Sequence, residues 1–443
     1  MKRGTLIAIV AHMAAVGMTA GQAQGRQQEP RITAFVNVNV IPMDEERVLR
    51  NYTVVVEQGR VMEMGPAGSI TVPASAQRID GSGKYLMPGL AEMHGHTPSG
   101  PFAETVMFLY VANGVTTVRG MLGLDGHLEL RRRANTGRII APTLYLAGPS
   151  FNNRTVQSPQ HAAERVRLQK LEGWDHLKIH PGLTLEQYDA LARTASAVGM
   201  RFGGHVPADV GIVHAIKMGQ LTFDHLDGYL EYAGGIDGPI DDAKLDEVIE
   251  LTKQAGAAVV PTSVLWEVGI IGLGDVDEMV NYPEMRYWLR RGVDQWARSV
   301  RSRRANPNFD AETARAFAEN RRILLKRLSD AGVTILMGTD SPQMFSVPGF
   351  SIHREMQYMQ DAGLSPYEVL KSGTKSVGEY FRNNDAFGTV GVGRRADFIL
   401  TNSNPLDDVA NVADRVGVMV RGRWLSEEMI QQRLEEIARE LGN

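Results

Sequence analysis

The chain has 443 residues, of which 43% are hydrophobic and 22% are charged, an ordinary composition for a globular protein with a large core. Its formal net charge is −4, so nothing favours nucleic acid or an anionic membrane as a partner. The absence of cysteine excludes disulfides and cysteine-ligated zinc, so a metal would rest on histidine, carboxylate or modified lysine.

The first 23 residues have the pattern of a secretory signal peptide. Lys2 and Arg3 are basic, Leu6 to Met18 is mostly apolar, and Gly21-Gln22-Ala23 offers small residues for cleavage. We expect residues 1–23 to be removed and the mature protein to be secreted or periplasmic. An uncleaved membrane anchor is the alternative, although the apolar run is short for a spanning helix.

Both ends of the remaining chain are predicted to be β-rich. Short apolar runs at 32–38, 53–56 and 60–64 are separated by turn residues, and 396–400 and 416–420 have the same style. We therefore expect residues 31–87 and 388–428 to form one small β-sandwich domain built from both termini.

Strands alternate with helices between these ends, over residues 88–387. The candidate strands are Leu86–His94, Val115–Arg119, Thr143–Ala147, His176–His180, Met200–His205, Leu221–His225, Ala258–Thr262 and Thr334–Gly338. Helices are indicated at 188–198, after a Thr184 capping box, and at 207–218, 124–133 and 311–328. This alternation predicts an α/β fold, a (β/α)8 TIM barrel, with a doubly wound sheet as the alternative.

The segment from 263 to 333 is long for a connection between barrel strands. It is expected to form a lid, an oligomer contact or a solvated helical excursion. If it folds over the site, Arg290, Arg291 and Arg298 could hold an acidic group, but a solvated face is the simpler interpretation.

Residues suited to metal binding end several of the predicted strands. They are His94 and His96 on the first strand, Lys178 in the fourth, His205 on the fifth, His225 on the sixth and Asp340 after the eighth. Each alone has an ordinary structural explanation, as a turn, core or capping residue. Together they are expected to converge at the mouth of a barrel, where the carboxyl ends of the strands meet.

Three further residues are weaker candidates for contact with substrate. His180 and Tyr229 lie just past Lys178 and His225, and either could bind a substrate carboxylate or oxyanion. His127 follows the second strand, although it is more simply explained as part of a helix.

The chain resembles the amidohydrolase superfamily over residues 31–428. The motifs that carry the resemblance are Leu86-Met87-Pro88-Gly89-Leu90 before the histidine pair, Gly338-Thr339-Asp340, the tail run from Gly393 to Leu400, and Asn404-Pro405-Leu406. His205-Val206-Pro207 and Asp224-His225-Leu226 look most like the imidazolonepropionase-related branch, which includes Xaa-Pro dipeptidases and ochratoxin-type amidases.

The resemblance implies a site for two divalent metal ions, with zinc as the expected metal. His94, His96 and Asp340 would hold the more buried ion and His205 and His225 the more exposed one. Lys178 would bridge both as an N6-carboxylated side chain, and Asp340 would be the catalytic proton carrier.

The implied reaction is hydrolysis of a peptide-like amide in a small molecule or dipeptide, such as an N-acyl amino acid, an Xaa-Pro dipeptide or an ochratoxin-like amide. A cyclic-amide hydrolase or heterocycle deaminase is the alternative. Many such relatives use one metal and no lysine ligand, so Lys178 favours the two-metal hydrolase. A lactonase or organophosphate hydrolase and a non-catalytic barrel scaffold are further alternatives. Relatives in this branch often form homo-oligomers.

Overall fold

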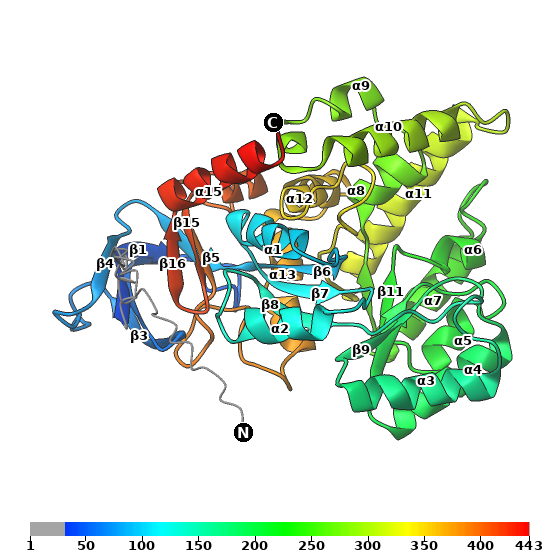
Figure 1. Ribbon diagram of the computed structural model, residues 1–443, viewed down its shortest axis with the longest axis horizontal. Helices are drawn as coiled ribbons and strands as arrows, with labels where there is room; N and C mark the ends of the chain where they lie inside the picture. The colour runs from blue at the N-terminus through cyan, green and yellow to red at the C-terminus, as the bar shows by residue number, and fades with distance from the viewer. Residues whose placement is uncertain (1–31, 443) are drawn as a thin grey trace, which may run out of the picture.

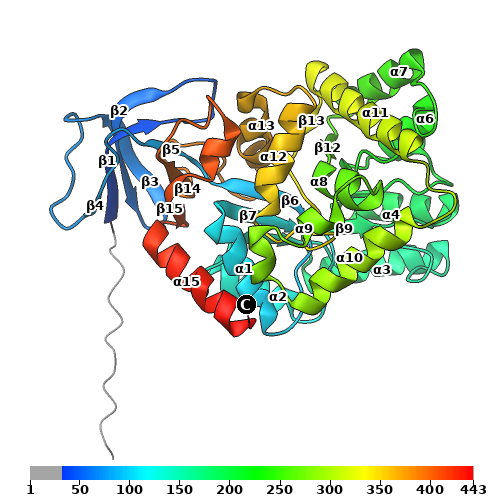
Figure 2. The same ribbon diagram turned by 90° about the horizontal axis from the view of Figure 1, so that it is seen from above.

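The computed structural model describes residues 32–442, so the predicted signal peptide at 1–23 lies outside the described residues. The protein is a mixed α/β structure. Figures 1 and 2 both place a sheet made from the two ends of the chain at one end of the molecule, with parallel strands and helices at the other. Within residues 32–442, no helix is long and apolar enough to cross a membrane.

The two ends of the described chain share one eight-stranded sheet, in the order β16-β15-β14-β5-β1-β2-β3 with β4 paired to β1. Its strands are β1 (Ile32–Val40), β2 (Leu49–Glu57), β3 (Arg60–Pro66), β4 (Gln77–Asp80), β5 (Tyr85–Pro88), β14 (Phe398–Thr401), β15 (Arg415–Val420) and β16 (Arg423–Ser426). Strands far apart in sequence are therefore neighbours, since β5 pairs with β14 and links the N-terminal strands to the C-terminal ones.

This terminal sheet folds back on itself. The rings of Phe35 on β1 and Trp424 on β16 have centroids 5.3 Å apart, although four strand spacings separate them in the sheet order. A flat sheet would place them about 19 Å apart, at about 4.8 Å per spacing. The bend encloses a core of its own, which includes Phe35, Val54 and Phe398.

The remaining strands are parallel and follow one another in chain order. They are β6 (Leu90–Gly95), β7 (Val115–Gly120), β8 (Thr143–Leu146), β9 (His176–Ile179), β10 (Arg201–Gly204), β11 (Thr222–Asp224), β12 (Ala258–Val260) and β13 (Thr334–Ile335). A parallel bridge from Ala147 to His176 joins β8 to β9. Backbone bonds from Met93 to Met337 and from Asp340 to His94, both 2.8 Å, join the chain after β13 to β6.

Helices separate these strands and cover them. They are α1 (Phe102–Ala112), α2 (His127–Asn135), α3 (Pro159–Glu172), α4 (Leu185–Ala197), α5 (Ile212–Lys217), α6 (Tyr229–Ala233), α7 (Asp242–Gln254), α8 (Ser263–Leu265), α9 (Val276–Met279), α10 (Arg290–Arg304), α11 (Ala311–Asp330), α12 (Ser351–Asp361), α13 (Pro366–Gly373), α14 (Lys375–Tyr380) and α15 (Glu427–Glu440), with short helical turns η1 (Trp266–Ile270), η2 (Pro283–Tyr287) and η3 (Val409–Val412). The capping box at Thr184 and the helix from Ala311 are confirmed.

Several predicted bounds differ from the structure, and one helix was not predicted. The first predicted strand is two strands, because the chain passes at Gly89 from the terminal sheet to the parallel strands. A Cβ at Gly89 would lie 2.3 Å from Thr116 Oγ1, so only glycine fits this crossing. The helix expected from 207 begins only at Ile212, after a turn. The C-terminal helix α15 was not predicted, although Ile430, Leu434 and Ile437 repeat with helical spacing and are buried.

Candidate metal centre

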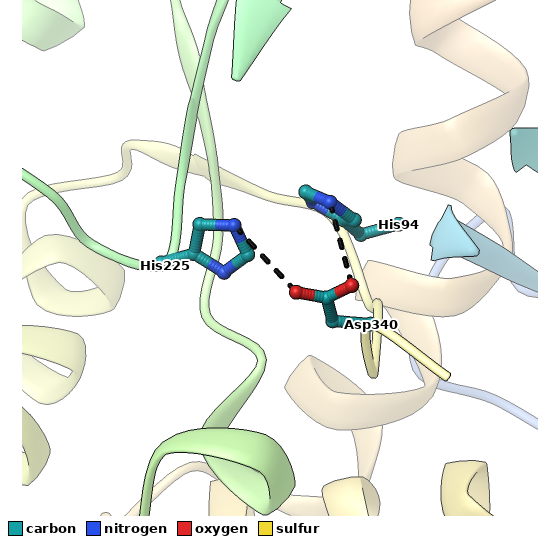
Figure 3. A group of neighbouring side chains, drawn as sticks. All are labelled: His94, His225 and Asp340. Atoms are coloured by element: carbon teal, nitrogen blue, oxygen red, sulfur yellow. Dashed lines mark ion pairs between the residues drawn. The ribbon is translucent and has the colours of Figure 1, made fainter. Parts of the chain in front are cut away.

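The predicted metal ligands gather where the parallel strands end. His94 lies on β6, His96 just past it, and Lys178 on β9, while His205, His225 and Asp340 follow β10, β11 and the extension of β13. His94, His225 and Asp340 each offer a ligand atom, and these atoms lie within 4.8 Å of one another. Figure 3 shows the two imidazoles turned toward the Asp340 carboxylate from different elements.

The other predicted ligands border this cluster. His96 Nε2 lies 2.7 Å from Asp340 Oδ1, and the His205 ring centroid is 4.4 Å from that of His225. The sequence prediction placed these residues together, and the structure brings them together. His94 and His225 are buried, whereas the side chains of His96 and His205 keep 20% and 19% of their surface exposed.

Three of the histidines have one ring nitrogen engaged away from the cluster. His94 Nδ1 lies 2.8 Å from Asp224 Oδ2, and His205 Nδ1 lies 2.7 Å from Asp227 Oδ2. His225 Nδ1 is 2.8 Å from Thr262 Oγ1, while its buried Nε2 has no hydrogen-bond partner. Metal-binding histidines are oriented in this way, with one nitrogen held and the other turned toward the ion.

A buried ion pair supports His94 from behind. Arg119 on β7 donates to both oxygens of Asp224 at 3.0 and 2.9 Å, and also to the carbonyl of Met93 and the hydroxyl of Thr222. Although burial alone would raise it, the charge of Arg119 keeps the pKa of Asp224 below its usual value. Asp224 therefore stays anionic beside the His94 ring and fixes its orientation.

Lys178 reaches the centre of the site. It is fully buried, and its Nζ lies 2.9 Å from His94 Nε2. Burial lowers the pKa of Lys178 to about 8, because an ammonium group loses its hydration there. Burial likewise holds the pKa of His94 and of His225 well below the usual value, so both rings are neutral and can act as ligands.

Backbone strain is concentrated around the same residues. His225, Thr262 and Asp340 have φ of 66°, 48° and 60°, in the left-handed region that non-glycine residues seldom occupy. Such strain persists where the surrounding structure holds the backbone, and it is typical of functional sites. Glu92 contributes to holding this backbone in place. It accepts hydrogen bonds from the backbone N–H groups of His94 and Thr339, and these bonds connect β6 to the loop that carries Asp340.

A cavity of about 620 Å³ opens above the ligands. The floor contains the ligand histidines and Asp340, and the walls are mostly apolar. The wall residues include Phe102, Leu122, Leu124, Leu265, Trp266, Ile270, Trp288, Leu289 and Pro342. The 263–333 segment supplies five of these, so it forms part of the cavity wall instead of a solvated excursion.

The three weaker candidates are placed differently. His180 lines the cavity with its ring stacked 5.3 Å from His205, and burial lowers its pKa to about 2, so it is neutral. Tyr229 is fully buried, and its hydroxyl lies 2.9 Å from Thr252 Oγ1, outside the cavity lining. His127 starts α2, is 3% exposed and accepts from the backbone N–H of Leu124. The positions of Tyr229 and His127 do not support substrate contact, because packing turns both away from the cavity.

The donor set fits a divalent metal. Neutral imidazoles, a carboxylate and a buried amine converge, and an unpartnered buried nitrogen of His225 points into the group. Imidazole and oxygen donors suit zinc and its neighbours in the first transition series. The sequence did not single out Arg119, Thr262, Asp227 or Gln343, which position these ligands. Only Arg119 gave a signal, as a charged residue ending an apolar strand.

The fold and the cluster thus fit a metal-dependent enzyme with a mixed α/β structure. The chain belongs to the Amidohydrolase family, whose model matches residues 85–425.

Curated relatives fall into two groups. Adenine deaminase 3 of Rhizobium meliloti (strain 1021) is 23% identical over 394 residues, covering 84% of this chain and 53% of the deaminase. Imidazolonepropionase of Stenotrophomonas maltophilia (strain R551-3) is 38% identical over 202 residues, covering 44% of this chain and 45% of that enzyme. The chain thus spans about half the length of these relatives.

Solved structures share the fold over most of the chain. Bottromycin amidohydrolase has a TM-score of 0.75 at 22% identity, covering 93% of this chain and 91% of that one. An Xaa-Pro dipeptidase has a TM-score of 0.66 at 20% identity, and the match covers 89% of this chain and 100% of the dipeptidase. Ochratoxinase of A. niger has a TM-score of 0.66 at 19% identity, and the match covers 90% of this chain and 96% of the ochratoxinase.

Proposed function

We propose that the protein is an exported two-metal amidohydrolase that cleaves a peptide-like amide bond in a small molecule. The observation that carries this proposal is the fully buried Lys178 amine, 2.9 Å from His94 Nε2 among the ligand residues. A buried ammonium is costly at a cationic site, whereas the carbamate of Lys178 would supply anionic oxygens to two ions. The export part of the proposal rests on the leader pattern in residues 1–23.

We also infer a closed (β/α)8 barrel beside a two-layered terminal domain. The cyclic hydrogen-bonded order of β6 to β13 supports the barrel, and the contact of Phe35 with Trp424 supports the second layer. In a barrel, the active site lies at the carboxyl ends of the strands, which is where the ligand residues gather.

His94, His96, His205, His225, Lys178 and Asp340 would hold two divalent ions, most simply zinc. When bound, such ions lower the pKa of a water molecule and polarise a substrate carbonyl. Asp340 would accept the proton of that water and pass it to the leaving nitrogen. Oδ2 of Asp340 is the better placed oxygen, because Oδ1 already contacts His96 and accepts from Gln343 at 2.6 Å.

The remaining residues bind, orient and exclude water. Asp224, Asp227 and Thr262 fix the rings of His94, His205 and His225, so the ligands need little rearrangement during the reaction. The apolar walls keep bulk water away from the reacting amide, which strengthens the electrostatic interactions there.

A cyclic-amide hydrolase or heterocycle deaminase is the second candidate. The similarity to imidazolonepropionase and to adenine deaminases favours it, since these names describe ring substrates. The two candidates differ in the expected role of Lys178, which is required only by the two-metal site.

The deciding experiment combines metal analysis with a substrate panel. Wild type and Lys178→Ala would be analysed for metal and assayed on Xaa-Pro dipeptides, N-acyl amino acids, ochratoxin-like amides, cyclic amides and aminopurines. We expect about two ions per chain in wild type and fewer, with lost activity, in the variant. One ion or fewer, unchanged in Lys178→Ala, with turnover of rings, would replace this proposal with the second candidate.

A further inference from the structure

The cavity above the metal centre is lined by the ligand residues and by large apolar side chains. Its other polar lining residues are Thr97, His180 and Gln343. Phe102 packs edge-on against Trp288 at 5.2 Å, and Trp288 stacks on Trp296 at 5.6 Å. We call Phe102 and Trp288, which line the cavity, the aromatic wall, and Trp296 supports it from outside the lining. Because its rings brace one another, it presents a fixed apolar surface to whatever enters.

Among residues 32–442, no arginine and no lysine lines this cavity. The nearby cations have other partners or face solvent. Arg321 donates to the carbonyls of His225 and Pro261 and stacks on Trp266 at 4.5 Å. Arg290 pairs with Asp294 and is 73% exposed. The arginines of segment 263–333 were considered as a binding site for an acidic group of the substrate. None of them lines the cavity, so they do not form such a site there.

Arg154 is a further nearby cation, close enough to His180 to act on it electrostatically. It is exposed on the loop after β8 and lies outside the cavity lining. The described lining therefore offers a substrate carboxylate no fixed cation apart from the metal centre, where the scissile amide must bind.

A carboxylate placed in such a cavity would be poorly compensated. Enclosing an ionised carboxylate among apolar side chains is unfavourable unless a cation or several donors replace its hydration. Proteins that recognise carboxylates usually supply an arginine for this purpose. By contrast, a phenyl or branched alkyl group gains from burial against the aromatic wall.

We propose that this site selects amides whose groups flanking the scissile bond are uncharged and apolar, in preference to amides that carry a free carboxylate there. This inference rests on the proposed amide hydrolysis and narrows its substrate class. Water adds to the acyl carbon, the C–N bond breaks, and both protons of the water go to the nitrogen, which leaves a carboxylate and a protonated apolar amine. Free dipeptides and N-acyl amino acids are then the weaker substrates of the panel.

The test compares amides that differ by one carboxylate. N-phenylacetyl-benzylamine and N-phenylacetyl-phenylglycine share every atom except the carboxylate next to the nitrogen. A third compound, the benzylamide of 4-carboxyphenylacetic acid, moves the carboxylate to the acyl side. With the metal-loaded full-length mature protein, we expect kcat/KM for the neutral amide to exceed both others by about tenfold or more.

A cation added to the cavity should reverse part of this preference. Leu124 lines the mouth and is 40% exposed, so Leu124→Lys can be accommodated without burying the new charge. We expect it to raise the relative kcat/KM of the phenylglycine amide about fivefold, the effect of an exposed ion pair. Leu168→Lys, at a leucine of α3 that is 53% exposed, is the matched control and should change nothing.

Two results would overturn the inference. One is equal or better turnover of the carboxylate-bearing amides by wild type. The other is a neutral-amide preference that is unchanged in Leu124→Lys, which would mean that a missing cation does not cause it. If wild type prefers the carboxylate-bearing amides and Arg154→Ala removes that preference, Arg154 is the clamp. If none of the three compounds is hydrolysed, the proposed function fails for this class. Calorimetric binding of the same compounds then still decides between neutral and anionic groups.

Discussion

The metal centre has a buried side and an exposed side, and they are built differently. On the buried side, His94, Lys178 and His225 are enclosed, and their supports Asp224 and Thr262 are completely buried as well. On the exposed side, His205 is 19% exposed, and its partner Asp227 keeps 14% of its side-chain surface in solvent. The strained backbone at His225, Thr262 and Asp340 lies on the buried side or at its edge.

This difference indicates which ligand side chains are held rigidly and which can exchange their partner for water. Buried polar groups lose their hydration, so each must meet a defined partner, and removal of one partner leaves another uncompensated. At the exposed side, water can replace a lost partner. The buried side therefore sets the geometry of the ligands, and the exposed side lies next to His180 and the cavity.

The largest effect is expected at the carboxylate that joins the two sides. Asp340→Asn keeps the shape, and asparagine tolerates the φ of 60° at this position, but the proton carrier is lost. We expect kcat to fall by about 10³-fold with the fold retained. Hydrolysis of the best substrate of the panel and circular dichroism measure this. Asp209→Asn, exposed on the loop after β10, is the control; equal losses in both variants would remove Asp340 from the chemistry.

Removal of the support behind His94 tests the buried side directly. Arg119→Met leaves Asp224 as an unpaired buried charge, so we expect the free energy of unfolding to fall by about 3–5 kcal/mol. Chemical denaturation of the protein measures the change. Arg193→Met is the control, because it breaks the ion pair with Asp189 at an arginine side chain that is 69% exposed. We expect it to lower the free energy of unfolding by no more than about 1 kcal/mol. Similar losses for the two variants would contradict the contrast between buried and exposed groups.

Stability should also depend on pH through Glu355, a buried carboxyl behind the cavity wall. Glu355 on α12 accepts from the backbone N–H groups of Ser263 and Val264, and burial raises its pKa from 4.5 to about 7. The folded state thus binds this proton more tightly than the unfolded state. Its contribution to stability is complete below about pH 4.5 and is lost as the pH rises to about 7, by at most about 3 kcal/mol.

Denaturation of wild type and Glu355→Gln across pH 4.5 to 7 checks this sign. The stability of wild type relative to the variant should decrease as the pH rises. An unchanged difference across that range would mean that Glu355 does not titrate there.

The smallest effect concerns the two histidine supports. Thr262→Val removes the partner of His225 Nδ1, and we expect metal affinity to fall about tenfold. Asp227→Asn should weaken binding by less, because the exposed His205 can be held by water instead. Competition with a chelator measures both affinities. A greater loss in Asp227→Asn would reverse the assignment of the rigid and adaptable sides.

Much of the architecture and of the site followed from local patterns. Alternating strands and helices predicted an α/β fold, and the position of His94, His225 and Asp340 at strand ends predicted one shared site. Tyr229 shows the limit of this reasoning. Its position one turn after His225 suggested substrate contact, yet the hydroxyl is turned to Thr252, a partner on another helix.

The sequence by itself determined the chemistry of the ligands and their order along the strands, because residue type and local periodicity are properties of short segments. Only the tertiary structure decided which partner orients each ring, that the segment at 263–333 lines the cavity, and that no lysine or arginine among the described residues does so. These features depend on contacts between residues far apart in the chain. Arg119 and Asp224, or Trp288 and Phe102, become neighbours only when the strands and helices pack together.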